Sequence, residues 1–124
     1  MIAQILLIDD DPVVNFIHSK VIQKKFSSTP LLVFENGQKG LTHIKNNPDY
    51  SYLIFLDLNM PQMNGWEFLE AISHQASGVD LQVHIVTSSV NPEDRRAAEK
   101  FNKVGSFLIK PLKGVDITHI VFDH

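Results

Sequence analysis

The strongest constraint on the fold is the regular alternation of short apolar runs with helix-like segments along the chain. Five runs are rich in Val, Ile, Leu and Phe, and most are apolar throughout instead of alternating with polar residues. Such runs are typical of strands that are covered on both faces of a sheet. The five expected strands are Gln4–Ile8, Leu31–Phe34, Tyr52–Leu56, Gln82–Val86 and Ser106–Ile109.

The segments between these runs carry apolar residues at helical spacing. In the first segment Asp11 suits the N-cap position and Pro12 suits the first helical turn. The apolar stripe of this segment consists of Val14, Ile17, Val21 and Ile22. The last segment is short and holds Ile117, Ile120 and Val121. The expected helices are Pro12–Phe26, Gln38–Lys45, Asn64–Gln75, Pro92–Lys103 and a short last helix that begins near Gly114.

Five strand–helix repeats with short loops imply right-handed crossovers and a parallel sheet with helices on both faces. The chain has 124 residues, of which 44% are hydrophobic and 20% charged, so we expect one globular domain spanning residues 1–124. The formal net charge of −3 argues against direct DNA binding. No apolar run approaches the roughly 18 residues of a membrane span, and the acidic start of MIAQILLIDD is unlike a signal peptide. We therefore expect a cytoplasmic domain without membrane contact.

Functional sites of parallel α/β sheets form at the carboxyl ends of the strands, and four of the five expected strand ends carry reactive side chains. Crowded carboxylates repel one another unless a cation is present, and a set of hard oxygen ligands suits Mg²⁺, which brings phosphate chemistry. A lysine and a hydroxyl beside them would form an anion cradle around one carboxylate. The strand-end residues are Asp9, Asp10 and Asp11, then Asp57, then Thr87, Ser88 and Ser89, and finally Lys110.

Each of these residues also has an ordinary explanation when it is taken alone. The acidic triplet before Pro12 can serve only as a helix cap, Asp57 can be a turn residue, and Lys110 can be a solvated lysine. Their joint placement at successive strand ends is what favours a site.

A resemblance to a known family rests on four pieces of sequence: ILLIDDDP, LIFLDLNMPQMNGWEFL, VHIVTSS and FLIKP. In the second and most specific piece, Asp57 is followed by Met60–Pro61 and then by Gly65, which opens a helix. With these pieces the chain resembles the response-regulator receiver domains of two-component signalling over nearly its whole length. The resemblance implies an α/β, doubly wound, five-stranded parallel sheet of the flavodoxin-like (βα)5 type, with strand order 2-1-3-4-5.

The resemblance also implies a metal site and a phosphoacceptor. Asp57 matches the carboxylate that takes a phosphoryl group from a kinase histidine. Asp9 and Asp10 match the acidic pair, of which Asp10 binds Mg²⁺ directly and Asp9 acts through water. Asp57 and the backbone carbonyl of Asn59 are the other expected ligands.

A second group of residues matches the family's switch. Thr87 matches the hydroxyl that turns toward the acyl phosphate, and Lys110 matches the lysine that pairs with it across an expected cis Lys110–Pro111 bond. Phe107 matches the aromatic switch position, although it is equally a candidate core residue and has no hydroxyl to donate. Because Thr87 and Lys110 lie at strand ends, we expect their replacement to cost little stability, as at surface positions.

The expected function is a phosphorylation-activated switch that catalyses its own phosphorylation and dephosphorylation and is not a metabolic enzyme. Its expected partners are a sensor histidine kinase or phosphotransfer protein and an unspecified downstream protein, with the chain a monomer or weak dimer. No DNA-binding segment follows the fifth strand, so output would pass through partner binding, a phosphorelay or a further domain.

Three other functions fit less well. A Mg²⁺-dependent phosphatase with an aspartyl nucleophile uses a second Asp two residues later, where this chain has Asn59. A pseudo-receiver normally lacks part of the site, which is complete here. A Rossmann-type nucleotide binder needs a GxGxxG motif after the first strand, and none is present.

Overall fold

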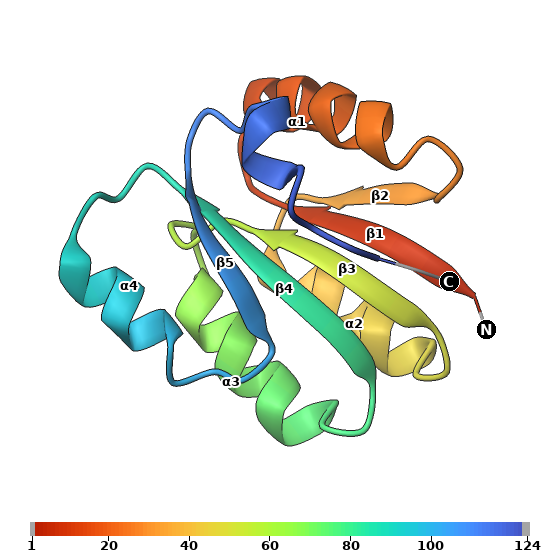
Figure 1. The fold of residues 1–124 in the computed structure, drawn as a ribbon. Coiled ribbons are helices and arrows are strands. Elements are labelled where there is room, and N and C mark those ends of the chain that lie inside the picture. The colour runs from red at the N-terminus through yellow and green to blue at the C-terminus, as the bar shows by residue number, and fades with distance from the viewer. Residues whose placement is uncertain (1, 123–124) are drawn as a thin grey trace.

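The computed structural model describes residues 2–122. The predicted domain of residues 1–124 also includes Met1, Asp123 and His124, which lie outside the described residues. All strand pairs are parallel, in the order β2-β1-β3-β4-β5, which confirms the predicted doubly wound α/β fold. Figure 1 shows the twisted sheet with helices above and below it. The strands are β1 (Ala3–Ile8), β2 (Leu31–Phe34), β3 (Ser51–Leu56), β4 (Asp80–Thr87) and β5 (Val104–Ile109).

Each α-helix begins at a polar N-cap residue whose side chain accepts backbone N–H groups of the first turn. Asp11 is the N-cap that the sequence predicts before Pro12, and Asn91 is the N-cap before Pro92. No helix within residues 2–122 is long and apolar enough to cross a membrane. The helices are α1 (Pro12–Lys25), α2 (Gly37–Asn46), α3 (Gly65–Gln75) and α4 (Pro92–Ala98), followed by a 3₁₀ helix, η1 (Gly114–Ile117).

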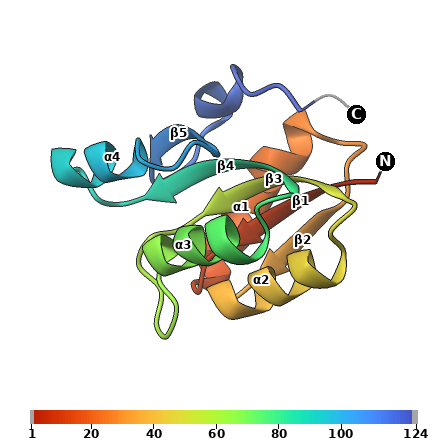
Figure 2. The same ribbon diagram turned by 90° about the horizontal axis from the view of Figure 1, so that it is seen from below.

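Two apolar clusters cover the two faces of the sheet. Successive strand residues alternate between them: Leu6 and Ile8 of β1 join the cluster under α2, α3 and α4, whereas Ile5 and Leu7 join the cluster under α1 and η1. Figure 2 shows α2 and α3 side by side on one face of the sheet, with α1 on the other. This division explains why the expected strands are apolar throughout.

The last two helices differ from their predicted extents. Helix α4 ends at Ala98 and not at Lys103, and the turn beyond it packs Phe101 in a stack with Trp66, with ring centroids 6.4 Å apart. The predicted fifth helix is only the 3₁₀ turn η1; Ile117 at its end and Ile120 beyond it are buried, while Val121 is 73% exposed. A segment this short gains few helical hydrogen bonds, so the burial of two apolar residues three positions apart decides its form.

A chain of side-chain hydrogen bonds attaches the segment after η1 to β4 and β5. His119 Nε2 lies 2.8 Å from Ser106 Oγ, which lies 2.8 Å from His84 Nδ1. His84 Nε2 lies 2.6 Å from Gln82 Oε1, and Gln82 Nε2 donates to the Val121 carbonyl at 3.2 Å. Since an amide oxygen only accepts, Nε2 of His84 carries the ring proton and Nδ1 accepts from the serine hydroxyl. The chain of bonds therefore uses a neutral His84.

We expect His84 to make the protein sensitive to acid. Burial and, to a lesser extent, the nearby His119 lower the pKa of His84 to about 4. An unfolded histidine titrates near pH 6.5, so the unfolded state binds more protons between the two values. The stabilising contribution is complete above about pH 6.5 and is lost as the pH falls toward 4, by up to about 3 kcal/mol. Urea unfolding of wild type and His84→Leu at several pH values between 7 and 4 tests this.

The pH dependence should be shallower in His84→Leu, whatever the absolute stability of that variant. His18 and His43, whose pKa values are also lowered mainly by burial, contribute to the remaining slope. His74→Leu, which removes an exposed histidine of α3, is the matched control and should keep the wild-type slope. An unchanged slope in His84→Leu would contradict the assignment.

Candidate functional site

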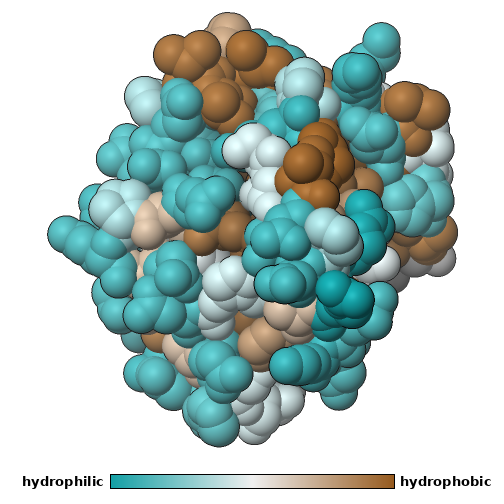
Figure 3. All heavy atoms as spheres, turned by 90° about the vertical axis from the view of Figure 1, so that its left-hand side faces the viewer, coloured by the Kyte–Doolittle hydropathy of each residue, from teal (hydrophilic) through white to brown (hydrophobic). Residues whose placement is uncertain are grey.

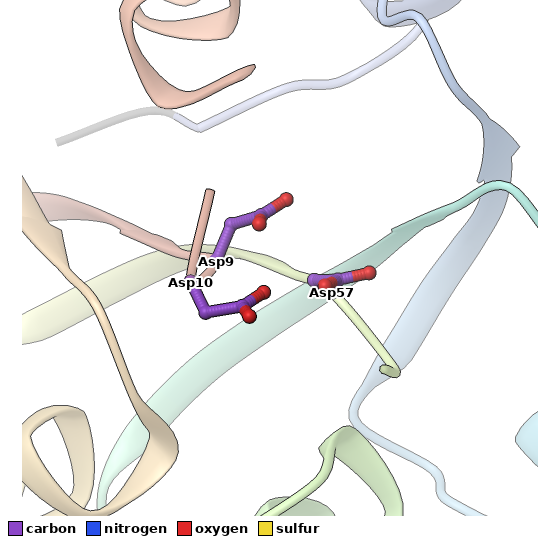
Figure 4. Close-up of side chains that lie close together, drawn as sticks. All are labelled: Asp9, Asp10 and Asp57. Carbon is purple, nitrogen blue, oxygen red and sulfur yellow. The ribbon is translucent and has the colours of Figure 1, made fainter. Parts of the chain in front are cut away.

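Three aspartates meet at the carboxyl ends of β1 and β3. Asp9 and Asp10 follow β1, Asp57 follows β3, and one carboxylate oxygen of each lies within 4.8 Å of the others. Asp9 and Asp57 are 2% and 5% exposed, whereas Asp10 is exposed. Figure 4 shows the three carboxylates extending to the same side of this edge. The strand-end rule thus places these three predicted residues together.

Lys110, at the end of β5, reaches the two buried carboxylates. Its Nζ lies 2.7 Å from Asp9 Oδ2 and 3.3 Å from Asp57 Oδ1, and its side chain is 19% exposed. Burial alone would lower the pKa of Lys110, but its contacts with both carboxylates raise it. The Lys110–Pro111 bond is cis, as the family resemblance implies.

The surroundings of Asp57 disfavour the charged form of its carboxyl group. Burial and then the charge of Asp9 raise its pKa, while Lys110 and a backbone N–H of Asn59 act in the opposite direction. The buried charge is therefore only partly compensated by the protein. Such a partly compensated carboxylate is suited to pair with an incoming positive charge or to react as a nucleophile.

The donor set fits a divalent cation of the Mg²⁺ type. The three carboxylates and the ammonium of Lys110 carry a formal charge of −3 + 1 = −2. An octahedral ion with ligand distances near 2.1 Å needs ligand oxygens about 3 to 4 Å apart, which a cluster within 4.8 Å can supply. Asn59 is exposed beside Asp57, and the role of its backbone carbonyl as a ligand stays a prediction.

Thr87 lies beneath the surface of the same edge. It is 0% exposed, its Oγ1 accepts a hydrogen bond from the Ser89 N–H at 3.2 Å, and its carbonyl accepts from the Lys110 N–H at 2.8 Å. The expectation that Thr87 and Lys110 behave as surface positions is therefore wrong, because one is fully buried and the other joins two buried carboxylates. The proposed switching of the Thr87 hydroxyl stays a prediction.

Phe107 lies beside a hollow between α4 and β5. It is partly buried against the cluster under α2 and α3, and the Arg95 guanidinium lies 5.0 Å from its ring centroid. The two residues and His119 line a surface hollow of about 390 Å³. The switch role of Phe107 stays a prediction.

Two residues near the site escaped the sequence analysis. Asn15 and His18 lie on the buried face of α1 together with Ile22, whereas Ile17, which we expected inside, is 49% exposed. Asn15 Nδ2 donates to the Asp9 carbonyl at 2.8 Å, and His18 Nε2 accepts from the Leu112 N–H at 3.1 Å. Asn15, His18 and Ile22 are three and four residues apart, which is the spacing of one helix face. The polarity of Asn15 and His18 obscured this signal.

Gly65 allows the start of α3 to approach the strand end that carries Asp57. Its N–H donates to the Leu58 carbonyl at 2.9 Å, and a Cβ there would lie 2.6 Å from the Asp57 carbonyl oxygen. No side chain larger than hydrogen fits without displacing this backbone.

Comparisons with known proteins agree on one family. A family model described as the response regulator receiver domain matches residues 5–122. The nitrate/nitrite response regulator NarL of Escherichia coli is 31% identical over 117 residues, which are 93% of this chain and 51% of NarL. The structure of a two-component response regulator from Cytophaga hutchinsonii superposes with a TM-score of 0.81 at 28% identity, covering 94% of this chain and 91% of that one. The chain spans about half the length of the curated relatives, 46% in the case of the regulators named DctR.

We expect Gly65→Ala to destabilise the protein by about 1–3 kcal/mol, the usual cost of overpacking. Gly78→Ala is the matched control, because a Cβ there meets nothing within 4 Å, and its effect should stay within the few tenths of a kcal/mol typical of open positions. Urea unfolding of the two variants measures the difference. Equal stabilities would show that the α3 start can shift away from Asp57 at no cost.

We expect Asp57→Asn to stabilise the protein at pH 7 in the presence of a metal chelator. The raised pKa of Asp57 means that the folded state binds its proton more tightly than the unfolded state, so the ionised carboxylate costs stability above the folded pKa. The neutral amide removes this cost. Melting temperatures at pH 7 should therefore rise in Asp57→Asn but not in Asp49→Asn, which removes an exposed carboxylate. A lower melting temperature for Asp57→Asn would refute the argument.

Proposed function

Because the chain belongs to the response regulator receiver domain family, we propose that it is a phosphorylation-activated signalling switch of a two-component system. In this proposal Asp57 accepts a phosphoryl group from a phosphohistidine of a sensor kinase or phosphotransfer protein in the cytoplasm. The observation that carries the proposal is the position of Asp57, buried beside Asp9 and 3.3 Å from the Lys110 ammonium.

The transfer is one substitution at phosphorus. A carboxylate oxygen of Asp57 forms the new O–P bond, the N–P bond of the phosphohistidine breaks, and its electron pair stays on the imidazole, which takes a proton from solvent. The chain's contribution is positioning and charge compensation, the two effects that dominate phosphoryl transfer. Lys110 supplies a cation beside the acceptor, and the Thr87 hydroxyl can donate to a phosphoryl oxygen.

Receiver domains bind Mg²⁺ in an acidic pocket, and in this chain the residues that would hold it are Asp9, Asp10, Asp57 and the carbonyl of Asn59. The ion would neutralise charge on the phosphoryl oxygens. Asp10, the exposed carboxylate of the cluster, is free of the Lys110 contact that occupies Asp9, which favours Asp10 as the direct ligand and Asp9 as the one that acts through water.

An exposed apolar patch on α1 supports delivery of the phosphoryl group by another protein. Val13, Phe16 and Ile17 are 66%, 65% and 49% exposed in the first turns after the acidic cluster. Figure 3 shows apolar side chains near the top of the molecule, the end that α1 occupies in Figure 1. Contiguous apolar surface beside a reactive group is typical of a protein-docking site.

The proposed product is a changed surface, not a released metabolite. Phosphorylation replaces the single negative charge of the Asp57 carboxylate by an acyl phosphate that carries about −1.5 to −2, and the protein responds by shifting between inactive and active forms. The active form then binds a downstream protein partner. The chain would also catalyse the removal of its own phosphoryl group, and we propose a monomer or weak dimer that does not itself bind DNA.

Incubation with acetyl phosphate and Mg²⁺, followed by intact mass spectrometry, tests the acceptor. Wild type and Asp49→Asn should gain about 80 Da, the mass of one phosphoryl group, and Asp57→Asn should not. Both variants remove one carboxylate, so they share the same change in net charge. If Asp57→Asn gained the adduct as readily as wild type, Asp57 would not be the acceptor.

A further inference from the structure

The buried face of α1 carries two polar side chains that each have an unused hydrogen-bonding atom. Asn15 is 5% exposed and His18 is 2% exposed. Among the residues that the structure describes, Asn15 Oδ1 and His18 Nδ1 have no hydrogen-bond partner. An unpaired buried polar atom costs stability, whereas an apolar side chain of similar size would have no such atom. The two residues must therefore be understood from the contacts that they do make.

His18 makes a contact that no apolar residue could replace. Its Nε2 accepts the backbone N–H of Leu112 at 3.1 Å. Burial, followed by the charge of Lys110, lowers the pKa of His18, although the charge of Asp9 acts in the opposite direction. The imidazole is therefore neutral near pH 7, with the lone pair of Nε2 available as the acceptor.

This contact controls a segment with few other backbone bonds. Residues 110–112 have only two N–H groups, because Pro111 has none. The Lys110 N–H donates to the Thr87 carbonyl at 2.8 Å, and the Leu112 N–H is the one that His18 accepts. The Leu112 side chain is buried in the cluster under α1 and η1, and His18 adds the hydrogen bond that orients the backbone just beyond Lys110.

The same helix is attached to the other side of the site. Asn15 Nδ2 donates to the Asp9 carbonyl at 2.8 Å, and the Asp11 N–H donates to Asp9 Oδ1 at 2.9 Å. Asn15 and His18 are three residues apart, on neighbouring turns of one helix face. The Lys110 Nζ contacts Asp9 Oδ2 at 2.7 Å. The contacts therefore form a closed ring, which runs from Asp9 to α1, from α1 to Leu112, and from Lys110 back to Asp9.

We propose that His18 is a positioning residue, which holds residues 110–112 through the Leu112 N–H and thereby sets where the Lys110 ammonium lies between Asp9 and Asp57. Its effect on phosphorylation rests on the proposed function, but the placement of Lys110 does not. Loss of the acceptor frees the backbone beyond Lys110, so the ammonium spends less time between the two carboxylates. A substitution at position 18 that keeps a hydrogen-bond acceptor at the same distance from the helix backbone keeps the Lys110 ammonium in place.

The experiment compares wild type with His18→Leu, His18→Gln and His84→Leu. Leucine is apolar and of similar size, glutamine restores an acceptor at a similar distance from the backbone, and His84→Leu removes an equally buried histidine that contacts Gln82 and Ser106. The first measurement, on unphosphorylated protein, is the side-chain ¹³Cε–¹Hε NMR signal of Lys110, assigned from its absence in Lys110→Arg. The second is the rate of the 80 Da mass gain with acetyl phosphate and Mg²⁺, for which about 80 Da marks one phosphoryl group.

In His18→Leu we expect the Lys110 signal to move toward those of solvent-exposed lysines. The phosphorylation rate should fall roughly fivefold, the factor that corresponds to one ordinary hydrogen bond. His18→Gln should recover both properties, and His84→Leu should retain both even where it lowers the unfolding midpoint. An unchanged Lys110 signal in His18→Leu, or a His18→Gln protein that folds but matches His18→Leu in both measurements, would overturn the proposal. A wild type that gains no mass would instead refute the proposed function, and the Lys110 signal would still decide the positioning role.

Discussion

The contact of Lys110 with two buried carboxylates is the interaction on which the rest of this site depends. Asp9 and Asp57 end the neighbouring strands β1 and β3, and in the absence of a cation their charges oppose both burial and each other. Lys110 comes from β5, separated from β3 by β4. With strands about 4.8 Å apart, the backbones of β5 and β3 lie about 10 Å apart, so the long lysine side chain crosses the end of β4 and meets the Asp57 side chain, which covers the rest of the distance. The small side chain of Thr87 at the end of β4 lies where this crossing occurs.

Much of this arrangement follows from the sequence because it depends on topology more than on side-chain detail. Continuous apolar runs separated by helical patterns require a parallel sheet, and a parallel sheet brings all carboxyl strand ends to one edge. Once that edge is predicted, Asp9, Asp57 and Lys110 are expected along it, whatever their exact rotamers. The family resemblance adds the strand order and the cis Lys110–Pro111 bond, both of which the structure has.

The features that escaped prediction depend on which way individual side chains face. The helical pattern predicts an apolar inner face of α1 that includes Ile17, whereas Asn15 and His18 occupy that face because they bond to neighbouring loops. The hydrogen-bonded chain through His84 and Ser106 depends on cross-strand pairing beside a register shift in β4 and β5, which no local pattern reveals. The shortening of the last helix has a similar cause, since tertiary burial outweighs weak local propensity.

In the proposed switch, the free-energy difference between the two states depends on how the charges at this edge are paired. In the unphosphorylated protein Lys110 divides its charge between Asp9 and Asp57. A phosphoryl group on Asp57 would place more negative charge farther from the backbone, so Lys110 and the Thr87 hydroxyl gain a stronger partner in that state only. The Thr87 Oγ1 now accepts the Ser89 N–H, and rotation of the hydroxyl would release that bond.

Release of the Ser89 N–H would couple this redistribution of charge to the surface loop that follows β4. The Ser89 Oγ donates to Asp94 at 2.6 Å, in the first turn of α4, and also accepts the Asn91 N–H. The loop between β4 and α4 therefore depends on a few hydrogen bonds, and it carries Val90 with 81% of its surface exposed. A state-dependent contact at Thr87 can shift the population of this loop because so little else holds it. The coupling thus requires no large rearrangement of the sheet, whose central strand β3 is buried along its whole length.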